Sequence, residues 1–145
     1  MSSDTNSDDG GVREAAGSRR ESPDRAPSLI YDLYRQGTGR LADGNAAGAV
    51  EVLELAVERA PSHASLHEAL GRAYFAASHP RRARAQFERA LELDPTDDYA
   101  HFGVGRCFER EGRLTEAAKF YKLACALAPR SEYETALERV LNRIA

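Results

Sequence analysis

The sequence predicts an all-α protein, an α-solenoid in which three helical hairpins of equal length stack and one further helix closes the stack. Two series of turn and small residues recur every 34 residues: Pro61, Pro95 and Pro129, and Gly37, Gly71 and Gly105. Good helix formers such as alanine, leucine, arginine and glutamate are frequent. Within each interval, apolar residues recur three and four positions apart, which indicates one buried helical face.

The first hairpin is predicted over residues 30–63. Gly44 marks its inner turn, because glycine readily adopts the left-handed conformation that ends many helices. Ala49, Leu53 and Ala56 then form the apolar stripe of its second helix, and each of the three belongs to a 34-residue series. The first unit therefore reads as two helices with a glycine between them.

The second hairpin is predicted over residues 64–97, with its inner turn at His79-Pro80. Pro80 suits the first turn of a helix, where the missing N–H would have no partner. Both helices carry apolar stripes. The residues are Leu66, Leu70, Ala73, Tyr74 and Ala77 in the first helix, and Ala83, Phe87, Ala90 and Leu91 in the second.

The third hairpin is predicted over residues 98–131, with its inner turn at Glu111-Gly112. A helical pair cannot cover its own apolar face, so the units stack and the last one needs a cover. Residues 132–145 supply it as a capping helix. Its apolar stripe consists of Ala136, Leu137, Val140, Leu141 and Ile144.

The segment 1–27 precedes this domain of residues 28–145. It is polar and acidic, and Val12 is its one large aliphatic residue after Met1. Such a segment cannot offset the entropy of ordering, so we expect a disordered tail.

The period and the residues that carry it resemble those of the tetratricopeptide repeat family. The match is clearest in the second unit, in A-S-L-H-E-A-L-G-R-A-Y-F from Ala64 and A-R-A-Q-F-E-R-A-L-E-L-D-P from Ala83. The resemblance covers residues 30–131. It departs at Arg40, where the later units have Tyr74 and Phe108, so we expect the first unit to pack least tightly.

The resemblance implies a right-handed superhelix whose concave groove, lined by the first helix of each unit, holds a peptide or helix of a partner. The register gives the groove residues: Tyr31, Tyr34, Arg35, Thr38, Glu68, Arg72, Phe75, Tyr99, Phe102, Arg106 and Glu109. Aromatic residues and arginines are enriched in binding hot spots. Arg72 and Arg106, one repeat apart, could together hold a carboxylate.

The leading hypothesis is therefore an interaction adaptor that binds another protein. Self-association into a homo-oligomer is the alternative, and an anion or RNA site at Arg81, Arg82 and Arg84 is less favoured. A well-known branch of the family grips chaperone C-terminal tails with lysine, arginine and asparagine. The corresponding positions are Tyr34, Thr38, Ala69, Tyr99 and Gly103. None is basic or asparagine, so we expect no chaperone-tail binding.

Several other functions find no support in the sequence. The net charge of −3 is not that of a general nucleic-acid binder, and no apolar run is long enough to span a membrane. His67 recurs as His101, which indicates packing rather than metal binding, and Cys107 and Cys125 read as small buried residues. Without a catalytic constellation, we expect no enzyme, no cofactor and no metal, and a cytoplasmic location.

Overall fold

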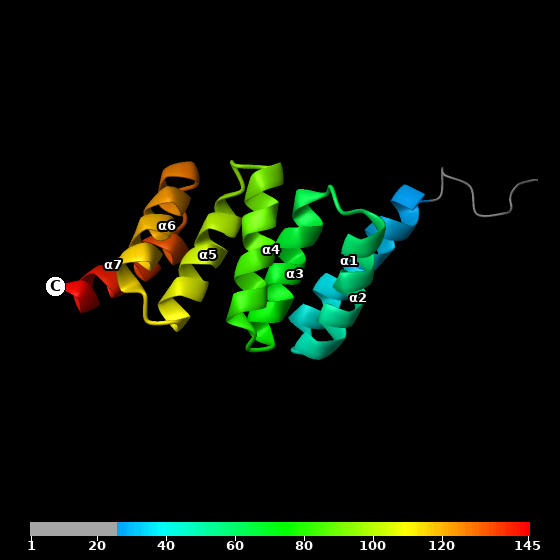
Figure 1. The fold of residues 1–145 in the computed structure, drawn as a ribbon, viewed down its shortest axis with the longest axis horizontal. Helices are drawn as coiled ribbons and strands as arrows, with labels where there is room; N and C mark the ends of the chain where they lie inside the picture. Colours follow the sequence, from blue (N-terminus) through cyan, green and yellow to red (C-terminus); the bar gives the residue numbers. More distant parts are fainter. Residues whose placement is uncertain (1–25) are drawn as a thin grey trace, which may run out of the picture. The chain divides into compact units, whose positions relative to one another are not determined.

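The computed structural model describes residues 26–145, and within them it contains helices and no strands (Figure 1). The helices are α1 (Ala26–Ala42), α2 (Ala46–Arg59), α3 (Ala64–Ala76), α4 (Pro80–Leu93), α5 (Asp98–Arg110), α6 (Leu114–Leu127) and α7 (Ser131–Ile144). The predicted all-α class is confirmed. The prediction of a disordered tail falls almost entirely on residues 1–25, outside the part that the structure describes.

Two helix boundaries differ from the sequence prediction. The first helix begins at Ala26, inside the segment assigned to the tail, with Pro27 as its second residue. Proline is tolerated there because the N–H groups of the first turn have no partner within the helix. The closing helix begins at Ser131 and ends at Ile144, whereas the prediction placed it at 132–145.

The inner turns of the hairpins use a residue with positive φ, as predicted for two of the three units. Gly44 has φ 81° and Gly112 has φ 79°. In the second unit the same role falls to Ser78, with φ 68°. Its N–H donates to the carbonyl of Phe75 at 3.0 Å, which closes the end of α3 before α4 begins at Pro80.

One contact recurs in every hairpin and explains two of the sequence series. The glycine of the first helix lies against the large apolar residue of the second, so that a Cβ at Gly71 would meet the ring of Phe87 at 2.9 Å. The equivalent pairs are Gly37 with Leu53 and Gly105 with Tyr121. Leu53, Phe87 and Tyr121 are all buried. The glycine therefore allows the two helices to approach until the large side chain fills the space between them.

The hydrophobic core is continuous from α2 to α7. From α1, only half-buried side chains pack against this cluster, Tyr34 and Leu41. Arg40, in the place of Tyr74 and Phe108, instead donates from Nη1 to the carbonyl of Gly48 at 3.1 Å. This agrees with the expectation that the first unit packs least tightly.

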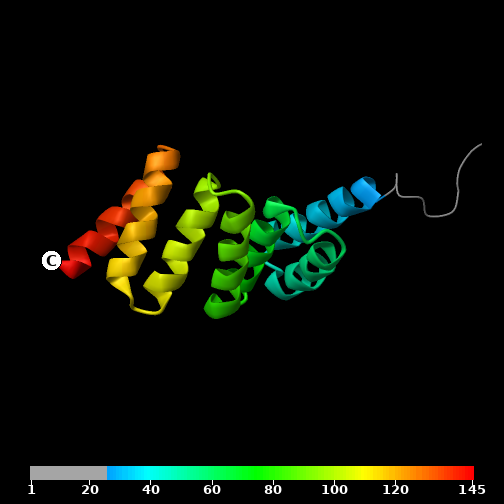
Figure 2. The same cartoon turned by 45° about the horizontal axis from the view of Figure 1, so that its top comes forward.

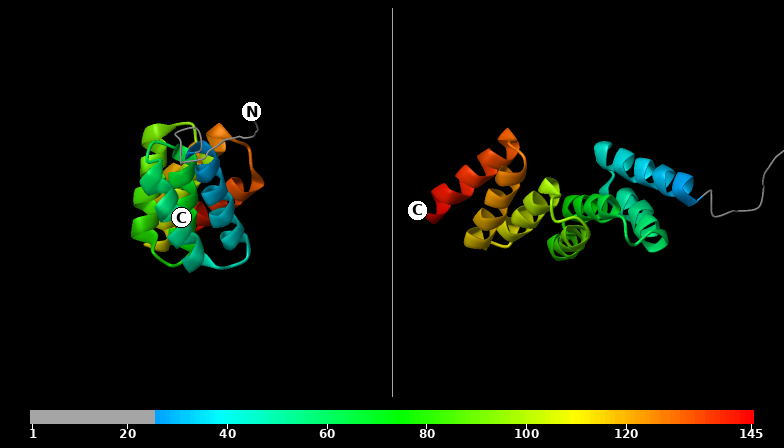
Figure 3. Two further views of the ribbon diagram at one scale, coloured as in Figure 1. Left: turned by 90° about the vertical axis from the view of Figure 1, so that its right-hand side faces the viewer. Right: turned by 90° about the horizontal axis from the view of Figure 1, so that it is seen from above.

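Within residues 33–145, α3 and α4 form one antiparallel hairpin and α5 and α6 the next, and α7 packs against α6 (Figures 2 and 3). The first helices α3 and α5 also contact each other across the unit boundary. They therefore present one continuous face. None of the helices in residues 26–145 is both long and apolar enough to cross a membrane.

Candidate binding groove

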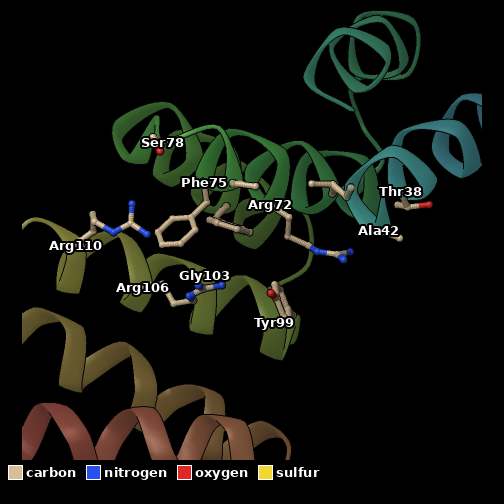
Figure 4. Close-up of a pocket in the computed structure, with 12 residues that line it drawn as sticks. Thr38, Ala42, Arg72, Phe75, Ser78, Tyr99, Gly103, Arg106 and Arg110 are labelled. Carbon is tan, nitrogen blue, oxygen red and sulfur yellow. The ribbon is translucent and has the colours of Figure 1, made fainter. Parts of the chain in front are cut away.

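The face made by the first helices is hollowed into a cavity of about 430 Å³ (Figure 4). Its walls come from the last turns of α1 and from the facing sides of α3 and α5. The residues that matter most for its chemistry are Thr38 and Ala42 of α1, Arg72 and Phe75 of α3, and Tyr99, Arg106 and Arg110 of α5.

Three arginines, which we term the arginine cluster (Arg72, Arg106 and Arg110), are held in this cavity by aromatic rings. The guanidinium carbons of Arg106 and Arg110 each lie 4.3 Å from the centre of the Phe75 ring. That of Arg72 lies 5.5 Å from the centre of the Tyr99 ring. Such stacking engages the face of a guanidinium and leaves its in-plane N–H donors available.

The arginine cluster lacks acidic partners. Among residues 26–145, no carboxylate lies within 4.0 Å of these three guanidinium groups, although several other arginines form such pairs. Arg72 nevertheless interacts with Glu68, whose pKa it lowers. The excess positive charge of the cavity therefore lies at Arg106 and Arg110, where it would attract an anionic group.

Glu109, predicted as a groove residue, instead forms hydrogen bonds to the capping helix α7. Tyr121 donates to its Oε1 at 2.6 Å, and Arg139 of α7 donates two hydrogen bonds of 2.8 Å, one to each oxygen. Arg143 lies 3.9 Å from Oε2. The hydrogen bonds from Arg139 lower the pKa of Glu109. Its carboxylate is therefore not available to compensate the arginine cluster.

Acidic residues lie at the opposite ends of the same helices, at Glu68, Asp97 and Asp98. Burial, reinforced by the neighbouring Asp97 carboxylate, raises the pKa of Glu68 to about 7. Asp97 caps α5 by accepting from the N–H of Ala100 at 3.0 Å, and burial raises its pKa. The groove thus has acids near the N-termini of α3 and α5 and two arginines, Arg106 and Arg110, toward the C-terminus of α5, while Arg72 lies over Tyr99 nearer the acidic end.

The predicted groove residues do not all reach the cavity. Five of them line it: Thr38, Arg72, Phe75, Tyr99 and Arg106. Glu68 is half-buried and Arg35 exposed, while Tyr31 is 60% exposed.

Phe102 belongs to the core rather than to the groove surface. It is only 4% exposed and packs on Tyr121 and Tyr133 at 5.5 and 4.8 Å between ring centres. Arg110 was missed by the sequence analysis. The available signal was its spacing of four from Arg106, which puts both on one helical face.

The arginines on α4 are largely engaged within the protein. Arg84 lies 4.6 Å from the centre of the Phe108 ring and 3.9 Å from Glu111. Arg89 pairs with Glu92 at 2.8 Å, and Arg82 lies over the Tyr74 ring at 5.9 Å. Arg84 and Arg89 are thus paired with acids of this chain, and an RNA or anion site at Arg81, Arg82 and Arg84 stays an untested, less favoured prediction.

The histidines and cysteines have structural surroundings. His67 is buried, with Nε2 at 2.7 Å from the Pro61 carbonyl, and His101 repeats this contact with Pro95 at 3.0 Å. Both cysteines are free, and burial raises the pKa of Cys107 to about 12. The described residues contain no group of three or more histidine, cysteine or acidic side chains that could hold a metal ion.

The comparisons with known proteins agree with this architecture. The family model described as Tetratricopeptide repeat matches residues 34–78 and 68–132, together more than half of the chain. No curated protein is significantly similar to the chain in sequence.

Solved structures resemble the chain in fold at low sequence identity. The first TPR of Spaghetti (RPAP3) bound to the HSP90 peptide SRMEEVD has a TM-score of 0.77 at 19% identity, covering 81% of this chain and 94% of that chain. The Arabidopsis OM64 TPR domain has a TM-score of 0.76 at 18% identity, and the match covers 79% of this chain and 96% of that chain. The Yersinia enterocolitica type III secretion chaperone SycD, in complex with a peptide of the translocator YopD, has a TM-score of 0.74 at 17% identity. This match covers 81% of this chain and 96% of that chain.

Proposed function

Because this chain belongs to the tetratricopeptide repeat family, we propose that it is a non-enzymatic adaptor that binds a segment of another protein in the cavity between α1, α3 and α5. The observation that carries the proposal is the arginine cluster, which lines this cavity and has no carboxylate within 4.0 Å among residues 26–145. Two proteins of similar fold are described with bound peptides, from HSP90 and from YopD, which supports binding as the class of function.

The test blocks the cavity without changing its charge. Ala76, the last residue of α3, is exposed and lines the cavity, so Ala76→Trp fills it. Ala85→Trp, on an exposed position of α4, is the matched control. Full-length chains are used to capture partners from a lysate, and the captured proteins are identified by mass spectrometry. We expect a partner that binds the wild type and the control but is lost with Ala76→Trp. Equal capture by all three would place the binding surface elsewhere.

We further propose that the ligand is not a chaperone C-terminal tail, although two similar domains are described with an HSP90 and an HSP70 peptide. The positions of the family's tail clamp hold Tyr34, Thr38, Ala69, Tyr99 and Gly103, and none supplies a charged or amide donor to a terminal carboxylate. Calorimetry should show that SRMEEVD with a free C-terminus binds no more tightly than the same peptide with an amidated C-terminus. A preference for the free C-terminus that Ala76→Trp abolishes would contradict this proposal.

Self-association is the second candidate, and an apolar patch on the last two helices favours it. Leu123 and Leu127 of α6 and Leu141 and Ile144 of α7 are exposed. A hollow of about 530 Å³ lies among three of them, Leu123, Leu141 and Ile144. Light scattering on the wild type and on Leu141→Glu distinguishes the cases. A dimer that the substitution dissociates would support self-association, and a monomer at all concentrations would exclude it.

A further inference from the structure

We infer that the bound segment presents two closely spaced acidic side chains from its interior, seated on Arg106 and Arg110. This inference rests on the proposed function and names the chemistry of the partner. It follows from the spacing of these two arginines, the state of the neighbouring acids and the position of the acidic end of the groove.

The spacing of the two arginines is set by helix α5. Arg106 and Arg110 are four residues apart on α5, which separates their Cβ atoms by about 5–6 Å. Both guanidinium groups stack on Phe75 at the same distance of 4.3 Å, so the two cations are pre-positioned. Because both guanidinium carbons lie 4.3 Å from one ring centre, they are at most twice that distance apart. Carboxylates two residues apart in an extended segment, about 7 Å, or three to four apart in a helix, about 6 Å, lie within that limit.

The two arginines form an electrostatically unfavourable pair in the free protein. Like charges four residues apart on a helix cost a few tenths of a kcal/mol, and each guanidinium retains in-plane donors that suit a bidentate carboxylate. Glu109, the neighbouring acid, has both oxygens engaged by Arg139. An acidic group from outside the chain is therefore the missing partner.

The opposite end of the groove restricts where those acids can lie. Burial, together with the nearby Asp97 carboxylate, raises the pKa of Glu68 at that end to about 7, and Asp98 follows Asp97 in the chain. A partner's carboxylates should be less favoured at that end than at Arg106 and Arg110, although Arg130 pairs with Asp98 there at 3.4 Å. The bound segment should therefore have one orientation, with its acidic part toward the C-terminal ends of α3 and α5.

A chain terminus is a poorer match than an internal pair. The α-carboxylate of a terminus is a single anion, whereas Arg106 and Arg110 offer two separate cations. The comparison of an amidated peptide with one that has a free carboxylate tests this distinction directly.

The test uses the full chain and labelled 12-residue peptides of glycine, serine and leucine, with two glutamates placed two positions apart. Matched peptides carry glutamine in both places, and each is made with an amidated and with a free C-terminus. Binding is measured by fluorescence anisotropy for the wild type, Arg106→Gln/Arg110→Gln and the control Arg81→Gln/Arg82→Gln. The control makes the same charge change on α4. Circular dichroism melts check that all three proteins are folded.

We expect the amidated glutamate peptide to bind about tenfold or more tightly than the glutamine peptide, and the groove variant to lose that advantage. The control variant should keep the preference for the glutamate peptide, and added salt should reduce that preference. Arg106→Lys/Arg110→Lys retains the charge without the planar fork and should bind with intermediate affinity. Equal binding of the two peptides, equal loss in the control, or binding only with a free C-terminus would overturn the inference.

The lysate capture separates this inference from the proposed function. A partner that is lost with Ala76→Trp but retained by Arg106→Gln/Arg110→Gln would overturn the acidic-pair inference and leave the groove as the binding site. A partner retained by Ala76→Trp would overturn the proposed function itself.

Discussion

Glu68 is the side chain whose ionisation is most affected by its surroundings in the groove. It is half-buried on α3, with Asp97 and Asp98 of α5 raising its pKa and Arg72 lowering it. Burial has the largest effect, so the protonated form is favoured up to a pH of about 7. The folded state then holds a proton that the unfolded chain, with a pKa of 4.5, has already released.

The sign of the pH dependence follows from linkage. Because the folded state binds more protons between pH 4.5 and about 7, this group lowers the free energy of unfolding as pH rises through that window. Glu68→Gln should remove the penalty and make the protein more stable at pH 8 by roughly 1–3 kcal/mol, with little difference near pH 4.5. Urea unfolding at both pH values measures this. Glu88→Gln, an exposed position on α4, should show no such difference.

Gly103 shows how tightly the helices of adjacent units approach. A Cβ there would lie 2.5 Å from the buried Phe87 ring, which also contacts Gly71 of its own unit. Gly103→Ala should therefore destabilise the fold by about 1–3 kcal/mol. Gly39→Ala is the matched control, since nothing lies within 4 Å of its added Cβ, and it should stabilise α1 by up to about 1 kcal/mol. Thermal melts that rank the two variants in the reverse order would contradict the packing argument.

At the level of elements, α7 is attached to the preceding unit by polar as well as apolar contacts. Arg139 binds Glu109 of α5, and Tyr133 donates to Asp98 of the same helix at 2.6 Å. Tyr133, Ala136 and Val140 are buried beneath these bonds. The capping helix is thus fixed in register against α5 as well as packed on α6.

Arg139→Ala should lower the free energy of unfolding by about 1 kcal/mol at neutral pH, because Glu109 loses a bidentate partner that is half exposed. The pKa of Glu109 is lowered in the folded state, so this contribution is present above its ordinary value of 4.5 and is lost as the pH falls further. Denaturation at pH 7 and at pH 3 should show a larger effect at pH 7. Arg89→Ala, which breaks an exposed pair within α4, should cost less than about 0.5 kcal/mol.

At the level of the whole molecule, the core is one cluster from α2 to α7, so the units should not unfold separately. A chain ending at Arg130 would uncover Phe102 and Tyr121 and should lose more than about 3 kcal/mol of stability. Increased binding of a hydrophobic dye and a lower melting temperature would report this. A chain ending at Arg143 removes only exposed residues and should melt like the wild type.

The sequence by itself determined the repeating part of the protein. The 34-residue period and the residues around it predicted the hairpins and the turn glycines Gly44 and Gly112, whereas the pairing of Gly71 with Phe87 came from the structure. These features are local, since backbone conformation and the contact between two helices joined by a short turn depend on residues close together in the chain. Even so, the left-handed residue of the second turn proved to be Ser78, because a closed helix end needs the conformation rather than a glycine.

Only the tertiary structure decided which of the predicted groove residues are free of other contacts and could bind a partner. Glu109 and Arg139 are 30 residues apart, and Phe102 is covered by Tyr133. In both cases the partner lies on the capping helix, which the period does not describe. Arg110 lines the groove because it stacks on the Phe75 ring of the preceding unit. Contacts between units and with a non-repeating helix depend on how side chains meet across the stack, and a repeat register cannot give that information.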